Sequence, residues 1–218
     1  MDITLNELKI ISDKEGFNIN LIEKDYLITY LLYLLKDINK IYFKGGTALN
    51  KIFLNHARLS EDIDFTLIGS ITKTEKEIKQ RLTGTIFSRI SHDKRVDKFV
   101  RLVVHYKLFH DEGTIFIDLN ERATLAMPYE THSVHHFYAP FIPEFSVRTL
   151  AKEELIAEKV AATIGRNKPR DHYDVYMILK AGIPINMEFV KKKCRASGNE
   201  FSIPQNVQQS PGSKKEMG

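Results

Sequence analysis

The hydrophobic pattern of the first sixty residues predicts a buried helix, then a strand and a second helix joined by glycines. Asn20 and Glu23 have the spacing of a capping box, and the stretch LIEKDYLITYLLYLLKDI behind them is apolar over most of its surface, which is typical of a largely buried helix. Residues 41–43 are β-branched or aromatic, and residues 48–54 regain helical character. Gly45-Gly46 is therefore expected at the N-terminus of a helix.

The middle of the chain predicts further strands. Residues 62–68, DIDFTLI, alternate as a half-buried strand does, so Asp62 and Asp64 are expected on one face. Residues 72–91 are charged and amphipathic and predict a helix, although Gly84 interrupts it. Residues 99–109 and 114–120 are expected to form a hairpin.

The last third of the chain changes to a helical pattern. Residues 151–168 predict one helix, and residues 169–182 predict a second one with Pro169 at its first position. The final stretch, SIPQNVQQSPGSKKEMG, has almost no apolar residues and predicts a disordered tail.

Composition narrows the class of protein without deciding the function. A chain of 218 residues that is 43% apolar can bury a core, and its net charge of +4 is compatible with a phosphate-rich partner but does not require one. Cys194 is the only cysteine, which excludes an intramolecular disulfide and a cysteine-based zinc site. The longest apolar run, Tyr26 to Leu35, is too short to span a bilayer, and the first residues do not resemble a secretory signal, so we expect a cytoplasmic protein without a membrane partner.

The glycine pair has two interpretations. Backbone amides at a glycine turn that opens a helix can approach an anion closely, because glycine has no side chain and the helix dipole favours negative charge. Lys44 and the Thr47 hydroxyl would add donors, which makes Lys44, Gly45, Gly46 and Thr47 candidates for nucleotide binding. Taken alone, a Gly-Gly pair is more often a tight strand-to-helix connection that binds nothing.

The acidic residues also have two interpretations. Carboxylates that share one face of a strand repel each other unless a cation lies between them, and Mg²⁺ prefers such oxygen ligands together with substrate phosphates. Asp118, at the end of the apolar strand TIFIDLN, is the candidate for a third carboxylate. The alternatives are that Asp62 and Asp64 are solvated charges that protect a sheet edge, and that Asp118 initiates a turn.

The order of these motifs resembles a known family. KGGTAL, then RLSEDIDF, then a further acidic strand, then AEKVAATIGRNKPRDHYDV is similar to the AbiEii/AbiGii toxin-like nucleotidyltransferases of the polymerase-beta-like nucleotidyltransferase superfamily, from about Ile22 to Leu179. The resemblance implies an α+β fold in which a mixed sheet flanked by helices is followed by a helical C-terminal part. We place the core with its N-terminal helices at residues 1–145, the helical part at 146–200 and the tail at 201–218.

The resemblance also implies roles for individual residues. Gly45, Gly46 and Thr47 look like the triphosphate-binding turn, and Asp62 and Asp64 look like magnesium ligands. Lys159 and Asp171 look like the essential basic and acidic residues of the helical part, with Asp118 as third catalytic acid and metal ligand. Many relatives continue into a longer helical domain, whereas this chain turns polar soon after Cys194. We therefore expect its acceptor-binding surface to be reduced or altered relative to theirs.

The implied activity is magnesium-dependent transfer of a nucleoside monophosphate from a nucleoside triphosphate to an acceptor hydroxyl, with two Mg²⁺ ions or Mn²⁺ in their place. The implied acceptor is tRNA or another RNA, and the implied role is the toxin of an AbiE-like toxin–antitoxin or phage-defence system with a cognate antitoxin. Two rivals stay open: a catalytically silent nucleotide- or RNA-binding module, and a phosphotransferase that moves the γ-phosphate.

Residue spacing in the helical part fits these roles but has simpler explanations. Lys152, Lys159 and Arg166 recur every seven residues and are expected on one ridge of a helix, where they could also be solvated surface charges. Asp171 falls in the first turn of the next helix, where the helix dipole alone would stabilise a carboxylate. We expect Asp171 to order Lys159, and Asp174 to pair with Arg170 or another nearby base.

Overall fold

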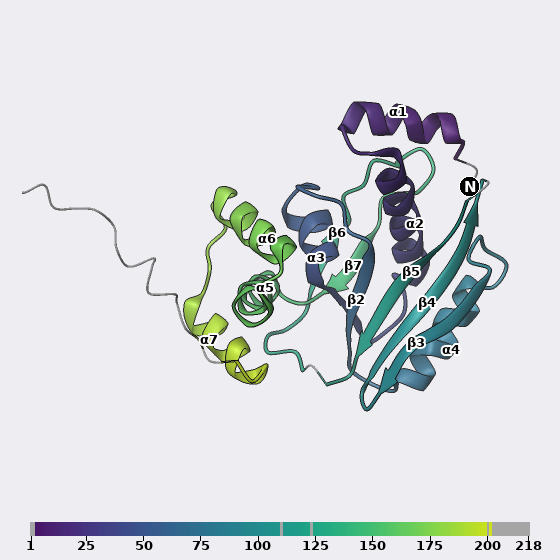
Figure 1. The fold of residues 1–218 in the computed structure, drawn as a ribbon. Helices are drawn as coiled ribbons and strands as arrows, with labels where there is room; N and C mark the ends of the chain where they lie inside the picture. The colour runs from purple at the N-terminus through teal and green to yellow at the C-terminus, as the bar shows by residue number, and fades with distance from the viewer. Residues whose placement is uncertain (1–2, 110, 123, 200, 202–218) are drawn as a thin grey trace, which may run out of the picture.

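A seven-stranded mixed sheet forms the centre of the fold in the computed structural model, which describes residues 3–109, 111–122, 124–199 and 201 (Figure 1). The strand order is β3-β4-β5-β2-β1-β7-β6. The strands are β1 (Ile41–Lys44), β2 (Asp62–Leu67), β3 (Arg89–Val96), β4 (Phe99–Leu108), β5 (Asp111–Asn120), β6 (Glu130–Ser133) and β7 (Ser146–Thr149). The predicted α+β fold, with a mixed sheet flanked by helices, is confirmed.

The register at the middle of the sheet brings the candidate residues to one place. β2 runs parallel to β5 with Asp64 opposite Asp118, and antiparallel to β1 with Lys44 opposite Asp64. Residues that lie opposite each other on paired strands project from the same face. The other face is the core, where Ile63 and Ile117 have no exposed surface.

Three helices complete the core: α1 (Leu5–Glu15), α2 (Ile19–Leu35) and α4 (Ile71–Leu82). α2 and α4 lie behind the sheet in the view of Figure 1 and contact each other. The predicted buried helix is therefore present, but it begins earlier than expected, because Asn18 rather than Asn20 caps it and accepts a hydrogen bond from the Asn20 amide. None of the helices in the described ranges is long and apolar enough to cross a membrane.

Two other expectations about the elements were wrong. The helix predicted over residues 72–91 ends at Leu82, and Gly84, with φ of 77°, lies in the turn that follows it. Residues 89–96 form edge strand β3 instead. Residues 146–149, placed at the start of the helical part, form β7 and pair with β1. The predicted hairpin is present as β4 and β5.

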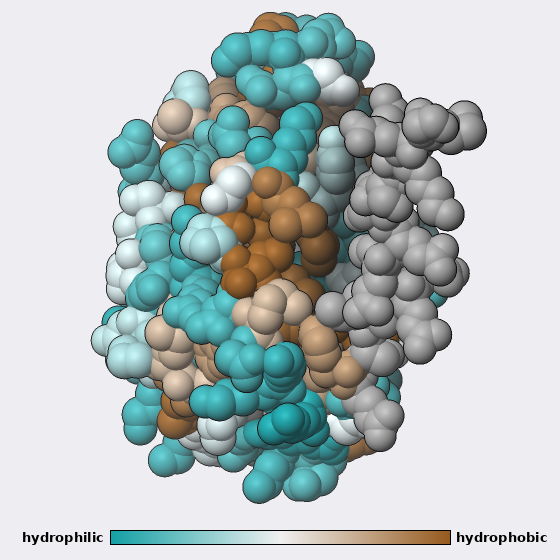
Figure 2. All heavy atoms as spheres, turned by 90° about the vertical axis from the view of Figure 1, so that its left-hand side faces the viewer, coloured by the Kyte–Doolittle hydropathy of each residue, from teal (hydrophilic) through white to brown (hydrophobic). Residues whose placement is uncertain are grey.

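The remaining helices form a group beside the sheet, which we call the helical half: α5 (Lys152–Arg166), α6 (Pro169–Lys180) and α7 (Met187–Ala196). Pro169 occupies the first turn of α6 as predicted. Figure 2 shows the outer side of this half, where an apolar patch is ringed by hydrophilic side chains. Of the predicted tail, only Phe201 is described, and it packs against the apolar cluster of α5 and α7; residues 202–218 lie outside the described residues.

A buried ion pair fastens α2 to the segment that follows the glycine turn. Lys51 and Asp25 are each 1% exposed, and Lys51 Nζ lies 2.7 Å from Asp25 Oδ1. The same ammonium donates to Thr29 Oγ1 at 2.9 Å, and the Tyr138 hydroxyl donates to the other oxygen of Asp25. Lys51 and Asp25 thus each have a further hydrogen-bond partner besides each other, which is the condition under which a buried ion pair is tolerated.

Removal of one partner of this pair should destabilise the fold strongly. We expect Asp25→Asn to lower the free energy of unfolding by about 3–5 kcal/mol, because it leaves the Lys51 charge buried without compensation. The exposed pair Lys107–Glu112 is the control, and Glu112→Gln should cost about 1 kcal/mol or less. Urea denaturation measures both; equal losses would contradict the structural role of the buried pair.

Candidate functional site

The glycine turn lies against the acidic strand. β1 ends at Lys44, and the chain continues into α3 (Gly45–Ala48) and the π-helical stretch η1 (Leu49–Phe53). Gly45 has φ of 78°, and a Cβ atom at this position would collide with the Asp64 carboxylate. A Cβ at Gly46 would lie 2.7 Å from Arg58 Nη2. Glycine is thus required at both positions because other groups approach the backbone closely. At Gly45 this group is the Asp64 carboxylate of the sheet, and at Gly46 it is the Arg58 guanidinium, whose ion pair is described below.

Asp62 and Asp64 project from the same face of β2, as the alternation predicted. Neither carboxylate has a hydrogen bond or an ion pair to any residue that the structure describes. Burial raises the pKa of Asp64 to about 6, and the neighbouring charges of Asp118 and Asp62 add to the rise. Burial likewise raises the pKa of Asp62. Burial raises the pKa of both carboxylates and neither has a partner among the described residues, so the two together fit a cation, which would remove their repulsion.

Asp118 lies beside Asp64, but its carboxylate has a partner that the sequence did not predict. Arg101 on β4 donates two hydrogen bonds to it, from Nε to Oδ1 at 2.7 Å and from Nη2 to Oδ2 at 2.8 Å. Within the described ranges, no group of three His, Cys, Asp or Glu side chains is arranged to hold a metal ion. Asp62 and Asp64 could therefore bind a divalent ion directly, whereas Asp118 could do so only after Arg101 moves.

On the other side of the glycine turn, five charged residues form an ion network that joins the core to the helical half. Lys159 is buried on α5, and its ammonium lies 2.8 Å from Asp171 Oδ1 and 2.9 Å from Asp174 Oδ2. Arg166 donates to Asp171 at 2.7 Å, and Arg58 donates to both oxygens of Asp174 at 2.8 and 2.7 Å. Three cations thus share two buried carboxylates, which leaves one positive charge next to Gly46.

This network corrects one expectation about the helical half and agrees with another. Lys159 does not lie on a solvated ridge with Lys152, because it is buried between Asp171 and Asp174. Lys152 instead lies over the ring of Phe53. The expected contact between Asp171 and Lys159 is present. Although burial opposes it, hydrogen bonds from Arg166 and Lys159 lower the pKa of Asp171 to about 2, so the carboxylate is charged near neutral pH.

Two of the candidate donors at the turn already have partners. The Thr47 hydroxyl is buried and donates to the Asp62 carbonyl at 2.5 Å, so it fixes the turn to β2 and is not free to bind a phosphate. Lys44 Nζ lies 3.2 Å from Glu158 Oε2, and Lys193 on α7 lies 2.9 Å from the other oxygen of Glu158. The backbone amides of the turn and the Lys44 ammonium remain as donors that face the cleft.

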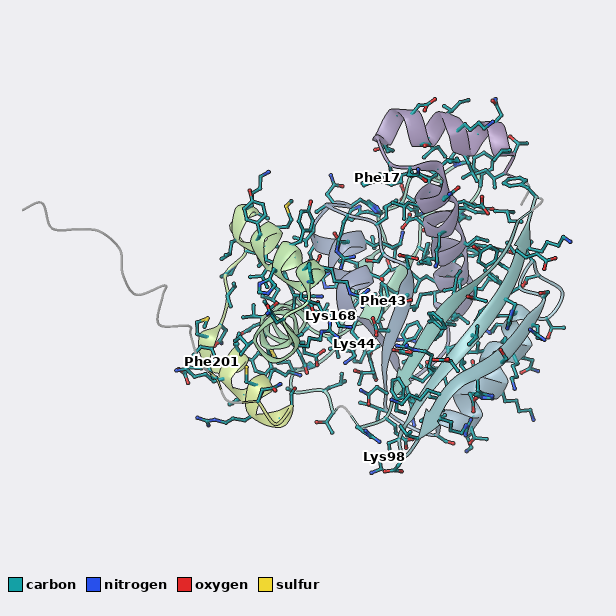
Figure 3. The ribbon with its side chains drawn as sticks, in the orientation of Figure 1. Phe17, Phe43, Lys44, Lys98, Lys168 and Phe201 are labelled. Carbon is teal, nitrogen blue, oxygen red and sulfur yellow. The ribbon has the colours of Figure 1, made fainter. Side chains whose placement is uncertain are left out.

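These groups line one cleft of about 790 Å³ between the sheet and the helical half. The glycine turn, Asp62, Asp64, Asp118 and Lys159 all contribute to its wall. Figure 3 shows Lys44, at the end of β1, and Lys168, at the start of α6, pointing into the same region between the two halves. Asp171 does not line the cleft and acts on it through Lys159 and Arg166.

Arg58 and Glu158 were not predicted as site residues, and both line the cleft. Arg58 belongs to the stretch RLSEDIDF that marks the acidic strand, and its neighbour Asn50 donates to Asp174 as well. Glu158 directly precedes Lys159. Their position next to a motif was thus an available signal. However, Arg58 pairs with Asp174 and Glu158 pairs with Lys44, each more than a hundred residues away in the chain, and no local pattern reveals such pairs.

The difference in stability between Gly45→Ala and Gly84→Ala measures the cost of the close contact between position 45 and Asp64. The two glycines have nearly the same φ, 78° and 77°, but no atom lies within 4 Å of a Cβ at Gly84. We expect Gly84→Ala to cost about 1–2 kcal/mol from backbone strain alone, and Gly45→Ala to cost at least about 2 kcal/mol more, because Asp64 must also be displaced. Urea unfolding of both variants measures the difference; equal costs would show that the contact with Asp64 is not tight.

Two solved structures share the fold of this chain, and a third matches it more weakly. The JHP933 protein of Helicobacter pylori has a crystal structure that matches with a TM-score of 0.57 and 22% identity over 74% of this chain, which spans 66% of that protein. A second H. pylori crystal structure matches with the same score and identity and is covered to 68%. The antibiotic-resistance factor ANT(2'')-Ia matches with a TM-score of 0.49 and 17% identity, over 81% of this chain and 91% of its own.

Sequence comparison identifies the family. No curated protein matches the chain. The family described as "Nucleotidyl transferase AbiEii toxin, Type IV TA system" matches residues 30–216, which is most of the chain. The chain therefore belongs to the AbiEii family of nucleotidyltransferase toxins.

Proposed function

We propose that this protein is a metal-dependent nucleotidyltransferase that moves a nucleoside monophosphate from a nucleoside triphosphate to a hydroxyl group of tRNA or another RNA. The observation that carries the proposal is the contact between the glycine turn and the acidic strand, since Gly45 touches Asp64 and both line one cleft. A triphosphate on the turn would have its α-phosphate close to the carboxylates.

The glycine turn and the ion network would hold the triphosphate. The amides of Gly45, Gly46 and Thr47 and the ammonium of Lys44 are donors at the cleft wall. Beside Gly46, Lys159 and its cationic neighbours carry one positive charge more than their two carboxylates neutralise. A fixed positive charge in a partly dry site stabilises the negative charge that develops on a leaving pyrophosphate.

Asp62 and Asp64 would hold the divalent ion, with Asp118 as an additional ligand. When bound, Mg²⁺ or Mn²⁺ supplies a Lewis acid that lowers the pKa of the attacking hydroxyl and stabilises the leaving oxygen, and a pair of ions can divide these tasks. In the reaction the acceptor hydroxyl loses its proton and forms a bond to the α-phosphorus, and the bond from that phosphorus to the bridging oxygen breaks. No histidine is found among the described residues that line the cleft, and a bound metal would make a histidine base unnecessary.

The family suggests the biological role. We propose that the protein acts in the cytoplasm as the toxin of a toxin–antitoxin or phage-defence system and that a cognate antitoxin restrains it. In this proposal the sheet carries the metal and the nucleotide, and the helical half, which begins at Lys152, supplies Lys159 and the wall that faces the acceptor.

A second candidate function is a nucleotide-binding module without catalysis. The pairing of Asp118 with Arg101 favours it, because this contact occupies the third carboxylate. The two candidates differ in whether product forms, since a binding module would bind the nucleotide and release it unchanged.

Asp64→Asn should abolish transfer. With α-labelled nucleotide, Mg²⁺ and total cellular RNA, we expect the wild type to label RNA and Asp64→Asn to label it at least about 10²–10³-fold more slowly, because a carboxylate that faces the α-phosphate has been lost. Asp13→Asn, on the exposed face of α1, is the matched control and should keep full activity. Label that enters RNA from γ-labelled and not from α-labelled nucleotide would instead indicate a phosphotransferase.

Transfer should also depend on a divalent ion. We expect label incorporation to stop in excess EDTA and to return when Mg²⁺ or Mn²⁺ is added back, because Asp62 and Asp64 alone repel the phosphates. The rate of incorporation before and after the addition measures this. Undiminished transfer in EDTA would argue against a metal on these carboxylates.

A further inference from the structure

The cleft is much more basic than the protein as a whole. Ten of the described residues that line it are Lys or Arg and five are Asp or Glu, whereas the whole chain has 32 basic and 28 acidic residues. The excess of basic over acidic residues is therefore concentrated in the cleft and is not spread over the whole chain.

Six of the ten cations are paired with carboxylates at 2.5–3.2 Å. They are Lys44, Arg58, Arg101, Lys159, Arg166 and Lys193. These pairs order the site that the proposed function assigns to the nucleotide and the metal. Carboxylates of the protein itself therefore neutralise most of the charge of these six cations.

The other four cations are exposed, and none has a carboxylate within 4.0 Å among the described residues. We call them the cationic rim: Arg122, Lys168, Arg170 and Lys192.

The rim residues come from both sides of the cleft. Arg122 follows β5, and its Nε donates to the Asp97 carbonyl at 2.8 Å, which holds its guanidinium in place. Lys168 and Arg170 lie at the start of α6, and Lys192 lies on α7. Arg170 and Asp62 both line the cleft, so the rim and the acidic strand belong to the same site.

A single triphosphate does not account for these four charges. The glycine turn, Lys44 and Lys159 already offer donors to a triphosphate, and both lysines are more buried than the four rim residues. Four unpaired cations around the mouth of an enzymatic cleft fit a ligand that carries several phosphates over an extended length. A neutral or cationic acceptor would gain nothing from them.

We propose that the cationic rim binds the phosphate backbone of a single RNA strand and so leads the acceptor hydroxyl into the cleft. This inference rests on the proposed nucleotidyl transfer, because it assigns the acceptor to that site. The rim residues position the strand and do not take part in the chemical step.

The test is the salt dependence of RNA binding by a rim variant and a matched control. The rim variant carries Arg122→Gln, Lys168→Gln, Arg170→Gln and Lys192→Gln. The control carries Lys9→Gln, Lys73→Gln, Lys76→Gln and Lys79→Gln, which remove the same charge from exposed positions on α1 and α4. The probe is a fluorescently labelled single-stranded RNA of about 20 nucleotides, without nucleotide or metal, and melting temperatures verify that both variants fold.

We expect the rim variant to lower the slope of log K against log salt by about 3, since each lost phosphate contact on a single strand contributes about 0.7. Its affinity at low salt should fall by at least about tenfold, and the control should keep the slope and affinity of the wild type. Equal losses in the two variants, or no RNA binding by the wild type, would overturn the inference. Binding of labelled nucleotide with Mg²⁺, measured separately, reports on the proposed function: if it is absent while rim-dependent RNA binding persists, the transfer proposal fails and the rim assignment does not.

Discussion

Repulsion among carboxylates at the middle of the sheet is the constraint on which the site depends. Parallel pairing of β2 with β5 places Asp118 beside Asp64, and the alternation of β2 places Asp62 on the same face. Burial and this proximity raise the pKa of Asp64 to about 6. Arg101 donates hydrogen bonds to Asp118 but not to Asp62 or Asp64. Asp62 and Asp64 are left to repel each other, and a fold that holds two such groups together without a partner is suited to bind a cation.

The glycine turn and the helical half are both positioned next to these carboxylates. Gly45 can approach Asp64 only because it lacks a side chain, and the Thr47 hydroxyl fastens the turn to the Asp62 carbonyl. On the far side, Arg58 and Lys159 join the core to α5 and α6 through Asp174. The cleft therefore has an acidic wall and a basic wall with the turn between them, as a bound metal–nucleotide complex requires.

Sequence reasoning predicted the parts of the site that local pattern encodes. The strand with Asp62 and Asp64, the turn at Gly45 and the start of α6 at Pro169 each follow from a few neighbouring residues. β3 was missed because most of its side chains are exposed at the sheet edge and show no alternation, and the four-residue strand β7 is too short for a period to appear. The ion pairs of Arg58 and Arg101 join distant segments, so only the fold reveals them.

The central claim is that one cleft holds the metal on the acidic strand and the phosphates on the glycine turn. A crystal structure with Mn²⁺ and a nucleoside triphosphate analogue that cannot be cleaved between the α- and β-phosphates tests it most directly, because the anomalous signal of manganese locates the ion. The account predicts manganese bonded to oxygens of Asp62 and Asp64, with the phosphates on the amides of Gly45 and Gly46. An ion bound elsewhere, or phosphates that contact only the cationic rim, would contradict it.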